Sequence, residues 1–351
     1  MPRDMLQQLQ EYYVRAFPEH PGAQVSNLVC LNDGWETDVY AFDVEWGAPS
    51  DRQKEELILR IYPGDSGIMK SGWEFRVLKN LTQANYPVPR TDRIEQDTSI
   101  FGKPFLIMER IRGKNLWQPL FHSFNPFERK RLLRLFCSLF AQLHTLDWRP
   151  FASDPAAFEN RDPRTLVERQ LDGWQPFFDS LPVPGFEANW QWLRAHQRDV
   201  SPAGLALTHW DFHPNNILLC DDSRGSRPAV VIDWAGLDIT DCRFDLAWTL
   251  VIVGGSEGMQ WREPIIREYE RQVGKPVTDL AYFDAAACVR RLYSAIASLT
   301  YGPEKLTMRP GAQTLIRKQA PAFKRVYELL LKCTGLPIPE VERFLEEEKR
   351  L

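Results

Sequence analysis

The stretch HWDFHPNN, residues 209–216, places two histidines, an aspartate and two asparagines between apolar segments. An apolar ILL follows directly, and a second apolar run, PAVVID, ends at Asp233, 17 residues after Asn216. Burying polar groups between strands is energetically unfavourable unless they form hydrogen bonds. The stretch therefore predicts either a closely hydrogen-bonded loop or a chemical site between two strands.

Three interpretations of residues 209–216 compete. In the first, the histidines and asparagines satisfy backbone groups through local hydrogen bonds. In the second, His209, Asp211 and His213 alternate along an extended chain like the ligands of a metal hydrolase. In the third, Asp211 receives the proton of an attacking hydroxyl and Asn216 holds magnesium during phosphoryl transfer.

Asp233 favours the third interpretation, because its carboxylate would emerge beside the loop at the end of an apolar strand. Magnesium prefers oxygen ligands, and Asn216 and Asp233 supply two of them. A metal hydrolase would more often recruit histidines later in the chain, and no histidine follows His213. We therefore expect phosphoryl transfer.

The surrounding pattern predicts an α+β fold of two lobes. Up to residue 110, alternating segments such as TDVYAFDVEW, EELILRIY and FGKPFLIMER predict a small antiparallel sheet carrying one helix. Beyond it, helical periodicity dominates, and Asn125 with Pro126 and Glu128 is typical of a helix start with a capping box. We expect an N-lobe over residues 1–110 and a mainly helical C-lobe over residues 111–351.

The motifs HWDFHPNNIL, VIDWAG and DCRFDLAW occur in an order that resembles the aminoglycoside phosphotransferase and choline kinase-like family, relatives of the protein kinases. The usual family pattern is close to HGDLHPGNIL, then IDWE, then GDPxxDLA. The resemblance covers roughly residues 25 to 275. Trp210 departs from it, since the family usually has glycine there.

The resemblance implies a role for each matching residue and a two-lobed, protein kinase-like fold. Asp211 would be the catalytic base, and Asn216 and Asp233 would bind Mg²⁺. His209 would brace the loop and Asp245 would anchor it from the start of a helix. His213 would either support the loop or take part in the site.

In the N-lobe, Arg60 stands where these enzymes place a Lys or Arg over the nucleotide phosphates. Glu74, 14 residues later, would hold Arg60 in position; alone, each would be a solvated charge. The stretch IMERIRG would be the hinge, where backbone groups of Glu109 and Ile111 meet adenine. The segment LNDGWETDVYAF would cover the phosphates, although it contains only Gly34.

The net charge and the composition indicate which binding partners and which cellular compartment to expect. The net charge of -4 and the lack of a basic run predict no nucleic-acid partner. The longest apolar run is about eight residues, against the ~20 of a membrane span, so we expect no membrane association. Six scattered cysteines without a C-x-x-C pair, and an N-terminus unlike a signal peptide, predict a cytoplasmic protein. The oligomeric state is left open.

The predicted function is transfer of the γ-phosphate of ATP, or of GTP, to a hydroxyl of a small molecule. The acceptor could be an aminoglycoside, an amino alcohol, a sugar or a hydroxy acid. Two alternatives stand beside it. The glycine-poor loop and Trp210 would suit a catalytically weak, pseudokinase-like binding protein, and the HxDxH pattern would suit a metal hydrolase.

Overall fold

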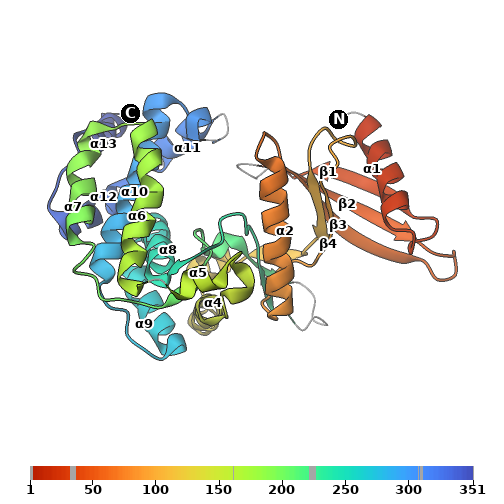
Figure 1. Cartoon of the computed structure of the whole chain (residues 1–351), viewed down its shortest axis with the longest axis horizontal. Helices are drawn as coiled ribbons and strands as arrows, with labels where there is room; N and C mark the ends of the chain where they lie inside the picture. The colour runs from red at the N-terminus through yellow and green to blue at the C-terminus, as the bar shows by residue number, and fades with distance from the viewer. Residues whose placement is uncertain are drawn as a thin grey trace. The chain divides into compact units, whose positions relative to one another are not determined.

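The computed structural model describes residues 3–31, 37–160, 162–220, 227–306, 308 and 311–350. The chain folds into two compact units, coloured by residue number in Figure 1. Unit 1 comprises Met1–Lys114 and Leu218–Ala235, and unit 2 comprises Asn115–Ile217 and Gly236–Leu351. The expected division lay at residues 110 and 111 and left residues 218–235 in the second part; in the structure these residues pack with unit 1.

Unit 1 is built on a five-stranded antiparallel sheet with the strand order β1-β2-β3-β5-β4. Its strands are β1 (Gln24–Cys30), β2 (Asp38–Trp46), β3 (Gln53–Ile61), β4 (Thr91–Glu95) and β5 (Phe105–Glu109). Four of the five strands follow the expected alternation. The fifth, β4, was not expected, because its sequence TDRIE follows a proline-rich segment and lacks a clear apolar alternation.

Two helices flank this sheet in Figure 1, α1 (Arg3–Ala16) and α2 (Gly67–Gln83). Leu57, Leu59 and Ile61 of β3 share one hydrophobic core with residues of α1. Arg60 alternates with them and pairs with Glu74 of α2. Since successive side chains of a strand point to opposite faces, α1 and α2 cover opposite faces of the sheet.

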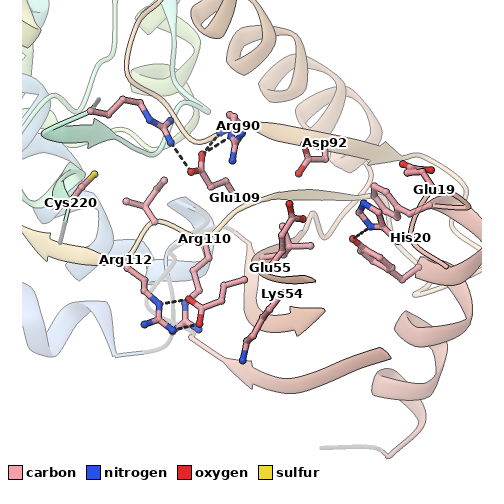
Figure 2. Close-up of a pocket in the computed structure, with 16 residues that line it drawn as sticks. Glu19, His20, Lys54, Glu55, Arg90, Asp92, Glu109, Arg110, Arg112 and Cys220 are labelled. Atoms are coloured by element: carbon pink, nitrogen blue, oxygen red, sulfur yellow. Dashed lines mark hydrogen bonds and ion pairs between the residues drawn. The ribbon is translucent and has the colours of Figure 1, made fainter. Parts of the chain in front are cut away.

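A pocket of about 640 Å³ opens on the α1 face of unit 1, and we call it the α1-side pocket. Figure 2 shows its charged lining, which includes Lys54, Arg90, Asp92 and Glu109. Leu57 also lines it, and so do Lys54 and Glu56, whose side chains alternate with that of Leu57 along β3, so the pocket also reaches the face that carries Arg60.

A second sheet contains β6 (Gly113–Asn115), β8 (Ile217–Cys220) and β9 (Ala229–Val231), in the order β6-β8-β9. Gly113 allows the close approach of β6 to β8, because a Cβ there would lie 2.0 Å from the carbonyl oxygen of Leu219. This pairing explains why residues 218–235 belong to unit 1 although they directly follow residues of unit 2 in sequence.

Unit 2 is mainly helical and also contains a two-stranded sheet of β7 (Leu205–Thr208) and β10 (Asp238–Asp241). Its α-helices are α3 (Trp117–His122), α4 (Pro126–Thr145), α5 (Pro155–Glu159), α6 (Leu166–Ser180), α7 (Glu187–His196), α8 (Cys242–Glu257), α9 (Arg262–Val273), α10 (Leu280–Tyr301), α11 (Ala312–Lys318), α12 (Ala320–Thr334) and α13 (Pro339–Arg350).

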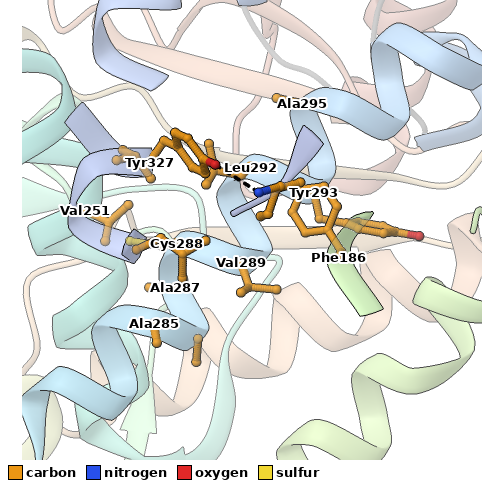
Figure 3. Close-up of a cluster of buried hydrophobic side chains, with 14 of the residues drawn as sticks. Phe186, Val251, Ala285, Ala287, Cys288, Val289, Leu292, Tyr293, Ala295 and Tyr327 are labelled. Carbon is orange, nitrogen blue, oxygen red and sulfur yellow. Dashed lines mark hydrogen bonds between the residues drawn. The ribbon is translucent and has the colours of Figure 1, made fainter. Parts of the chain in front are cut away.

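The core of unit 2 surrounds α10, whose buried face is rich in alanine. Figure 3 shows Ala285, Cys288 and Leu292 of this helix beside Val251 of α8 and Tyr327 of α12. Tyr327 is also tied to the segment before α13, because the amide of Ile338 donates to its hydroxyl at 2.9 Å. One continuous apolar cluster therefore positions α8 and α12 against α10.

The α+β fold class, with a strand-rich first part and a helical remainder, is confirmed. The helix start at Asn125 is confirmed as well, because its side chain accepts hydrogen bonds from the amides of Phe127 and Glu128. The capping box is only half formed, since the Glu128 carboxylate pairs with Arg131 instead. In the described part of the chain, no helix has the length and hydrophobicity of a membrane span.

Candidate active site

Residues 209–216 leave β7 as a loop that ends in a short 3-10 turn, Pro214–Asn216, before β8. Asp245, in the first turn of α8, is fully buried and accepts the backbone amides that open this loop. The amide of His209 donates to its Oδ2 at 2.6 Å, and the amide of Trp210 donates to its Oδ1 at 2.9 Å. Hydrogen bonds to a carboxylate are strong, so α8 fixes the start of the loop.

Three side chains hold Asp211. Trp248 Nε1 donates to its Oδ1 at 3.1 Å, and His213 Nε2 lies 3.3 Å from its Oδ2. The side-chain amide of Asn216 donates to the carbonyl oxygen of Asp211 at 3.0 Å and to Oδ2 at 3.3 Å. The Asp211 side chain is 46% exposed, so the carboxylate is oriented by the protein and still open to a ligand.

The Asp211 carboxyl ionises easily. Its partial burial opposes ionisation, but the interaction with His213 and the hydrogen bonds from His213 and Trp248 outweigh that cost, and the pKa of Asp211 lies well below its usual range. The group is therefore a carboxylate at neutral pH, ready to accept a hydrogen bond from a hydroxyl.

The loop is further fixed by contacts beneath it. The Phe212 ring stacks on Phe140 of α4 with centroids 4.2 Å apart, and Thr249 Oγ1 donates to the Phe212 carbonyl oxygen at 2.6 Å. His209 is buried and its Nδ1 lies 3.3 Å from the amide nitrogen of Asp211. His209 and Asp245 thus occupy supporting positions, whereas His213 touches the carboxylate itself.

Trp210 adopts a left-handed backbone conformation with φ of 65°. This conformation is uncommon for a bulky residue and easy for glycine, which the family pattern usually has at this position. The indole ring packs against Trp174 of α6 and Phe244 of α8, with centroid distances of 5.8 Å to each. The chain keeps the glycine-like backbone but fills the space with an aromatic side chain.

In unit 1, the Arg60 guanidinium joins two carboxylates. Its Nη1 lies 3.0 Å from Glu74 Oε1, and its Nη2 lies 3.2 Å from Asp233 Oδ1. Glu74 is 2% exposed and also accepts a hydrogen bond of 2.7 Å from the Tyr62 hydroxyl. The Arg60 Nε atom is buried and lacks a hydrogen-bond partner among the described residues. The expected Arg60–Glu74 pair is present, and Asp233 extends it.

Asp233 follows β9 with φ of 69°, a left-handed conformation that aspartate tolerates better than most residues. The next residue, Trp234, is buried and its indole nitrogen donates to the Val231 carbonyl oxygen at 2.9 Å. The Asp233 side chain is 49% exposed. A rigid backbone therefore presents an accessible carboxylate.

The oxygens of Asn216 and Asp233 are of the kind that Mg²⁺ binds. Both hydrogen bonds of the Asn216 side chain given above use its nitrogen and not its oxygen. Asn216 belongs to unit 2 and Asp233 to unit 1, and each is fixed within its own unit. Across the described ranges, no group of three His, Cys, Asp or Glu side chains is arranged to hold a metal ion.

At the expected hinge, Glu109 is already strongly bonded. Its carboxylate pairs with Arg227 at 2.6 Å. It also lies 3.4 Å from the Arg90 side chain, which Figure 2 shows beside it, and the Glu109 amide donates to the Arg90 carbonyl oxygen at 2.7 Å. Ile111, the other residue of the expected hinge contact, lines the α1-side pocket together with Glu109. The segment LNDGWETDVYAF was expected to cover the phosphates. Its residues 32–36, which include Gly34, lie outside the described residues.

Trp248 is a contact of the candidate site that sequence reasoning missed. The residue was part of the motif DCRFDLAW, but nothing in its spacing from Asp211 indicates a hydrogen bond across 37 residues. The sequence did contain one indication of this contact. On a helix that begins at residue 242, Asp245 and Trp248 are three residues apart and therefore lie on the same face, so a helix that anchors the loop through Asp245 also turns Trp248 towards it.

Comparison with known proteins defines the class to which this fold and site belong. A sequence model of the "Phosphotransferase enzyme family" matches residues 28–281, which is most of the chain. The chain belongs to this phosphotransferase family, and the resemblance to aminoglycoside phosphotransferases and choline kinase-like proteins is confirmed.

Two solved structures share the fold. The first is a candidate aminoglycoside phosphotransferase of Ralstonia eutropha JMP134, with a TM-score of 0.65 and 19% identity, covering 98% of each chain. The second is APH(2″)-IIIa in complex with GDP and kanamycin, with a TM-score of 0.59 and 16% identity, covering 93% of this chain and 98% of the other.

A curated relative is similar over a shorter stretch. Acyl-CoA dehydrogenase family member 10 of Mus musculus is 25% identical over 179 residues, which are 50% of this chain and 16% of the mouse protein. The match thus spans only a small part of that relative's length.

Proposed function

We propose that the protein transfers the terminal phosphoryl group of ATP or GTP to a hydroxyl of a small molecule, with Mg²⁺ as cofactor. The observation that carries the proposal is Asp211, an ionised and half-exposed carboxylate held by Trp248, His213 and Asn216. Such a group can orient a hydroxyl and accept its proton. Membership of a phosphotransferase family supports the same chemistry.

In the proposed reaction, the acceptor hydroxyl donates a hydrogen bond to Asp211 and its oxygen attacks the γ-phosphorus. The new oxygen–phosphorus bond forms while the bond to the bridging oxygen breaks, so that the nucleoside diphosphate leaves. The hydroxyl proton passes to Asp211 and from there to solvent. Asp245 and His209 keep the loop in place, so most of the rate enhancement comes from positioning.

The charge of the phosphates is balanced by two proposed groups. Arg60 contributes a guanidinium held by Glu74, and its side chain is 15% exposed. Mg²⁺, when bound by Asn216 and Asp233, neutralises negative charge on the phosphates. The backbones of Glu109 and Ile111 are proposed to contact the base.

The test is a screen for release of ADP or GDP with aminoglycosides, amino alcohols, sugars and hydroxy acids as acceptors. We expect release that depends on one acceptor class and on Mg²⁺, and that is lost in Asp211→Asn. A folded protein that binds the nucleotide with Mg²⁺ but phosphorylates no member of any class would contradict the proposal and favour a pseudokinase-like binding protein.

A further inference from the structure

Arg290 of α10 lies close to the candidate catalytic loop of unit 2. Its guanidinium carbon is 4.1 Å from the centroid of the Trp248 ring and 4.9 Å from that of Trp210. Trp248 is the residue whose indole nitrogen donates to Asp211. A single aromatic side chain therefore contacts both the Arg290 guanidinium and the proposed catalytic carboxylate.

Among the described residues, no carboxylate lies within ion-pair distance of Arg290. None of the ion pairs in the described part of the chain includes Arg290, and its Nη1 atom is buried without a hydrogen-bond partner there. The side chain as a whole remains partly exposed. Burial lowers the pKa of Arg290 to about 10, with Asp211 and Asp245 acting in the opposite direction, so it is still a cation at neutral pH.

Two other poorly exposed arginines of unit 2 pair with carboxylates. Arg243 lies 2.6 Å from Asp241, and Arg262 pairs with Asp284. This is the usual arrangement, because an unpaired charge away from water is unfavourable. Arg290 and Arg291 depart from it, since neither forms an ion pair among the described residues; of the two, Arg290 lies on the indole ring that donates to Asp211, whereas Arg291 contacts Gln319 and Phe323.

Two indole rings hold Arg290 without neutralising it. An arginine can stack on aromatic faces through its planar guanidinium and still donate hydrogen bonds from its edge. One of these rings belongs to Trp210, which adopts a left-handed backbone conformation that a bulky residue rarely adopts. Unfavourable backbone geometry that persists in a structure is most often found at functional sites.

We infer that Arg290 binds an anionic group of the acceptor, and that the acceptor is a hydroxycarboxylate. This inference rests on the proposed function. The carboxylate of the acceptor would bind the guanidinium edge while its hydroxyl meets Asp211. Arg290 would also offset the repulsion between Asp211 and an anionic acceptor. A polycationic aminoglycoside or an amino alcohol would instead bring its positive charge towards Arg290.

The experiment compares acceptors that differ only in charge: the hydroxybutanoate isomers, their amides and the corresponding butanediols. For wild-type protein we expect phosphorylation of a hydroxybutanoate in preference to its amide and diol. Arg290→Met keeps the length of the side chain but removes the charge. It should raise the KM for hydroxybutanoate about 10- to 100-fold, the effect of one charge-assisted hydrogen bond. The KM for the nucleotide should not change, and Arg290→Lys should recover part of the loss.

Arg291→Met is the matched control, because Arg291 is the next residue of α10 and its guanidinium contacts Gln319 and Phe323 instead of the two indoles. Melting curves identify variants that do not fold. Calorimetric titration of wild-type and Arg290→Met protein with hydroxybutanoate, without nucleotide, measures binding independently of turnover. We expect wild-type protein to bind it and Arg290→Met to lose that binding.

The outcomes separate the inference from the proposed function. If amino alcohols or diols are phosphorylated as well as hydroxybutanoates, and Arg290→Met changes nothing, the inference is wrong and the proposed function stands. A rise in the KM for the nucleotide alone would also overturn it, because Arg290 would then bind the transferred phosphoryl group. If hydroxybutanoate binds in an Arg290-dependent manner but no acceptor is phosphorylated, the anion site stands and the proposed function fails.

Discussion

At the scale of single residues, Glu74 explains why position 60 is an arginine. A carboxylate that is 2% exposed needs strong partners, and Glu74 has the Arg60 guanidinium and the Tyr62 hydroxyl. Arg60 reaches Glu74 with one terminal nitrogen and Asp233 with the other. Lysine has one charged nitrogen and lacks this fork. Position 60 therefore serves both the stability of unit 1 and the proposed phosphate site.

Arg60→Ala should consequently damage both stability and nucleotide use. Removing one partner of a buried ion pair costs about 3–5 kcal/mol, because the other charge is left without compensation. The double variant Arg60→Ala/Glu74→Gln removes the stranded charge and should recover much of the stability, but not the nucleotide KM. Urea denaturation and steady-state kinetics measure the two effects. Unchanged nucleotide kinetics in the folded double variant would exclude a phosphate role for Arg60.

At the scale of secondary structure, α8 is the element that organises the proposed catalytic loop, residues 209–216. Asp245, Trp248 and Thr249 lie at positions i, i+3 and i+4 and therefore on one face of the helix. Each bonds a different part of the loop: two backbone amides, the Asp211 carboxylate and the Phe212 carbonyl oxygen. Asp241 caps the same helix by accepting the amide of Arg243 at 2.9 Å. One helix thus fixes both the backbone of the loop and its key side chain.

Asp245→Asn should disturb this arrangement without a change in side-chain size. The substitution replaces one carboxylate oxygen with an NH₂ group. A hydrogen-bond donor then faces a backbone N–H of the loop, which needs an acceptor. We expect a loss of about 1–3 kcal/mol in the free energy of unfolding, the cost of an unsatisfied buried group. Turnover should fall while the nucleotide KM is kept, because Asp245 belongs to unit 2.

The matched control is Asp172→Asn, which changes an exposed aspartate of α6 that pairs with Arg194. Exposed ion pairs contribute at most about 1 kcal/mol, so this variant should behave like wild-type protein. Chemical denaturation of both variants compares their free energies of unfolding. Equal stability and equal turnover for Asp245→Asn and Asp172→Asn would show that Asp245 does not anchor the loop.

At the scale of the whole molecule, local sequence patterns predict some features and miss others for a physical reason. The antiparallel strands, the helix start at Asn125 and the Arg60–Glu74 pair follow from alternation, capping and family spacing. The bond from Trp248 to Asp211 and the position of Arg290 depend on how α8 and α10 pack in the core of unit 2. The return of residues 218–235 to unit 1 likewise depends on the pairing of β8 with β6. Contacts between distant segments have no local pattern that would reveal them.

The proposed roles are divided between the two units. Asp211 and Asn216 belong to unit 2, whereas Arg60, Glu109 and Asp233 belong to unit 1. The chain passes from unit 2 to unit 1 after Ile217 and returns after Ala235, so both proposed metal ligands lie within two residues of a crossing point. Substitutions in the two units should therefore affect separate steps of the reaction.

Asp211→Asn and Asp233→Asn test that division, because both remove one carboxylate charge and should fail differently. General-base contributions are typically ~10²–10⁴-fold in rate, so Asp211→Asn should lose about that much in kcat and keep its affinity for ATP with Mg²⁺. Asp233→Asn removes a proposed metal ligand and should weaken Mg²⁺-dependent ATP binding as well as turnover. Calorimetric titration of each variant with ATP, with and without Mg²⁺, separates the roles. If Asp211→Asn loses Mg²⁺-dependent binding while Asp233→Asn keeps it, the two roles are wrongly assigned, and normal turnover by both variants would exclude the phosphotransferase mechanism at this site.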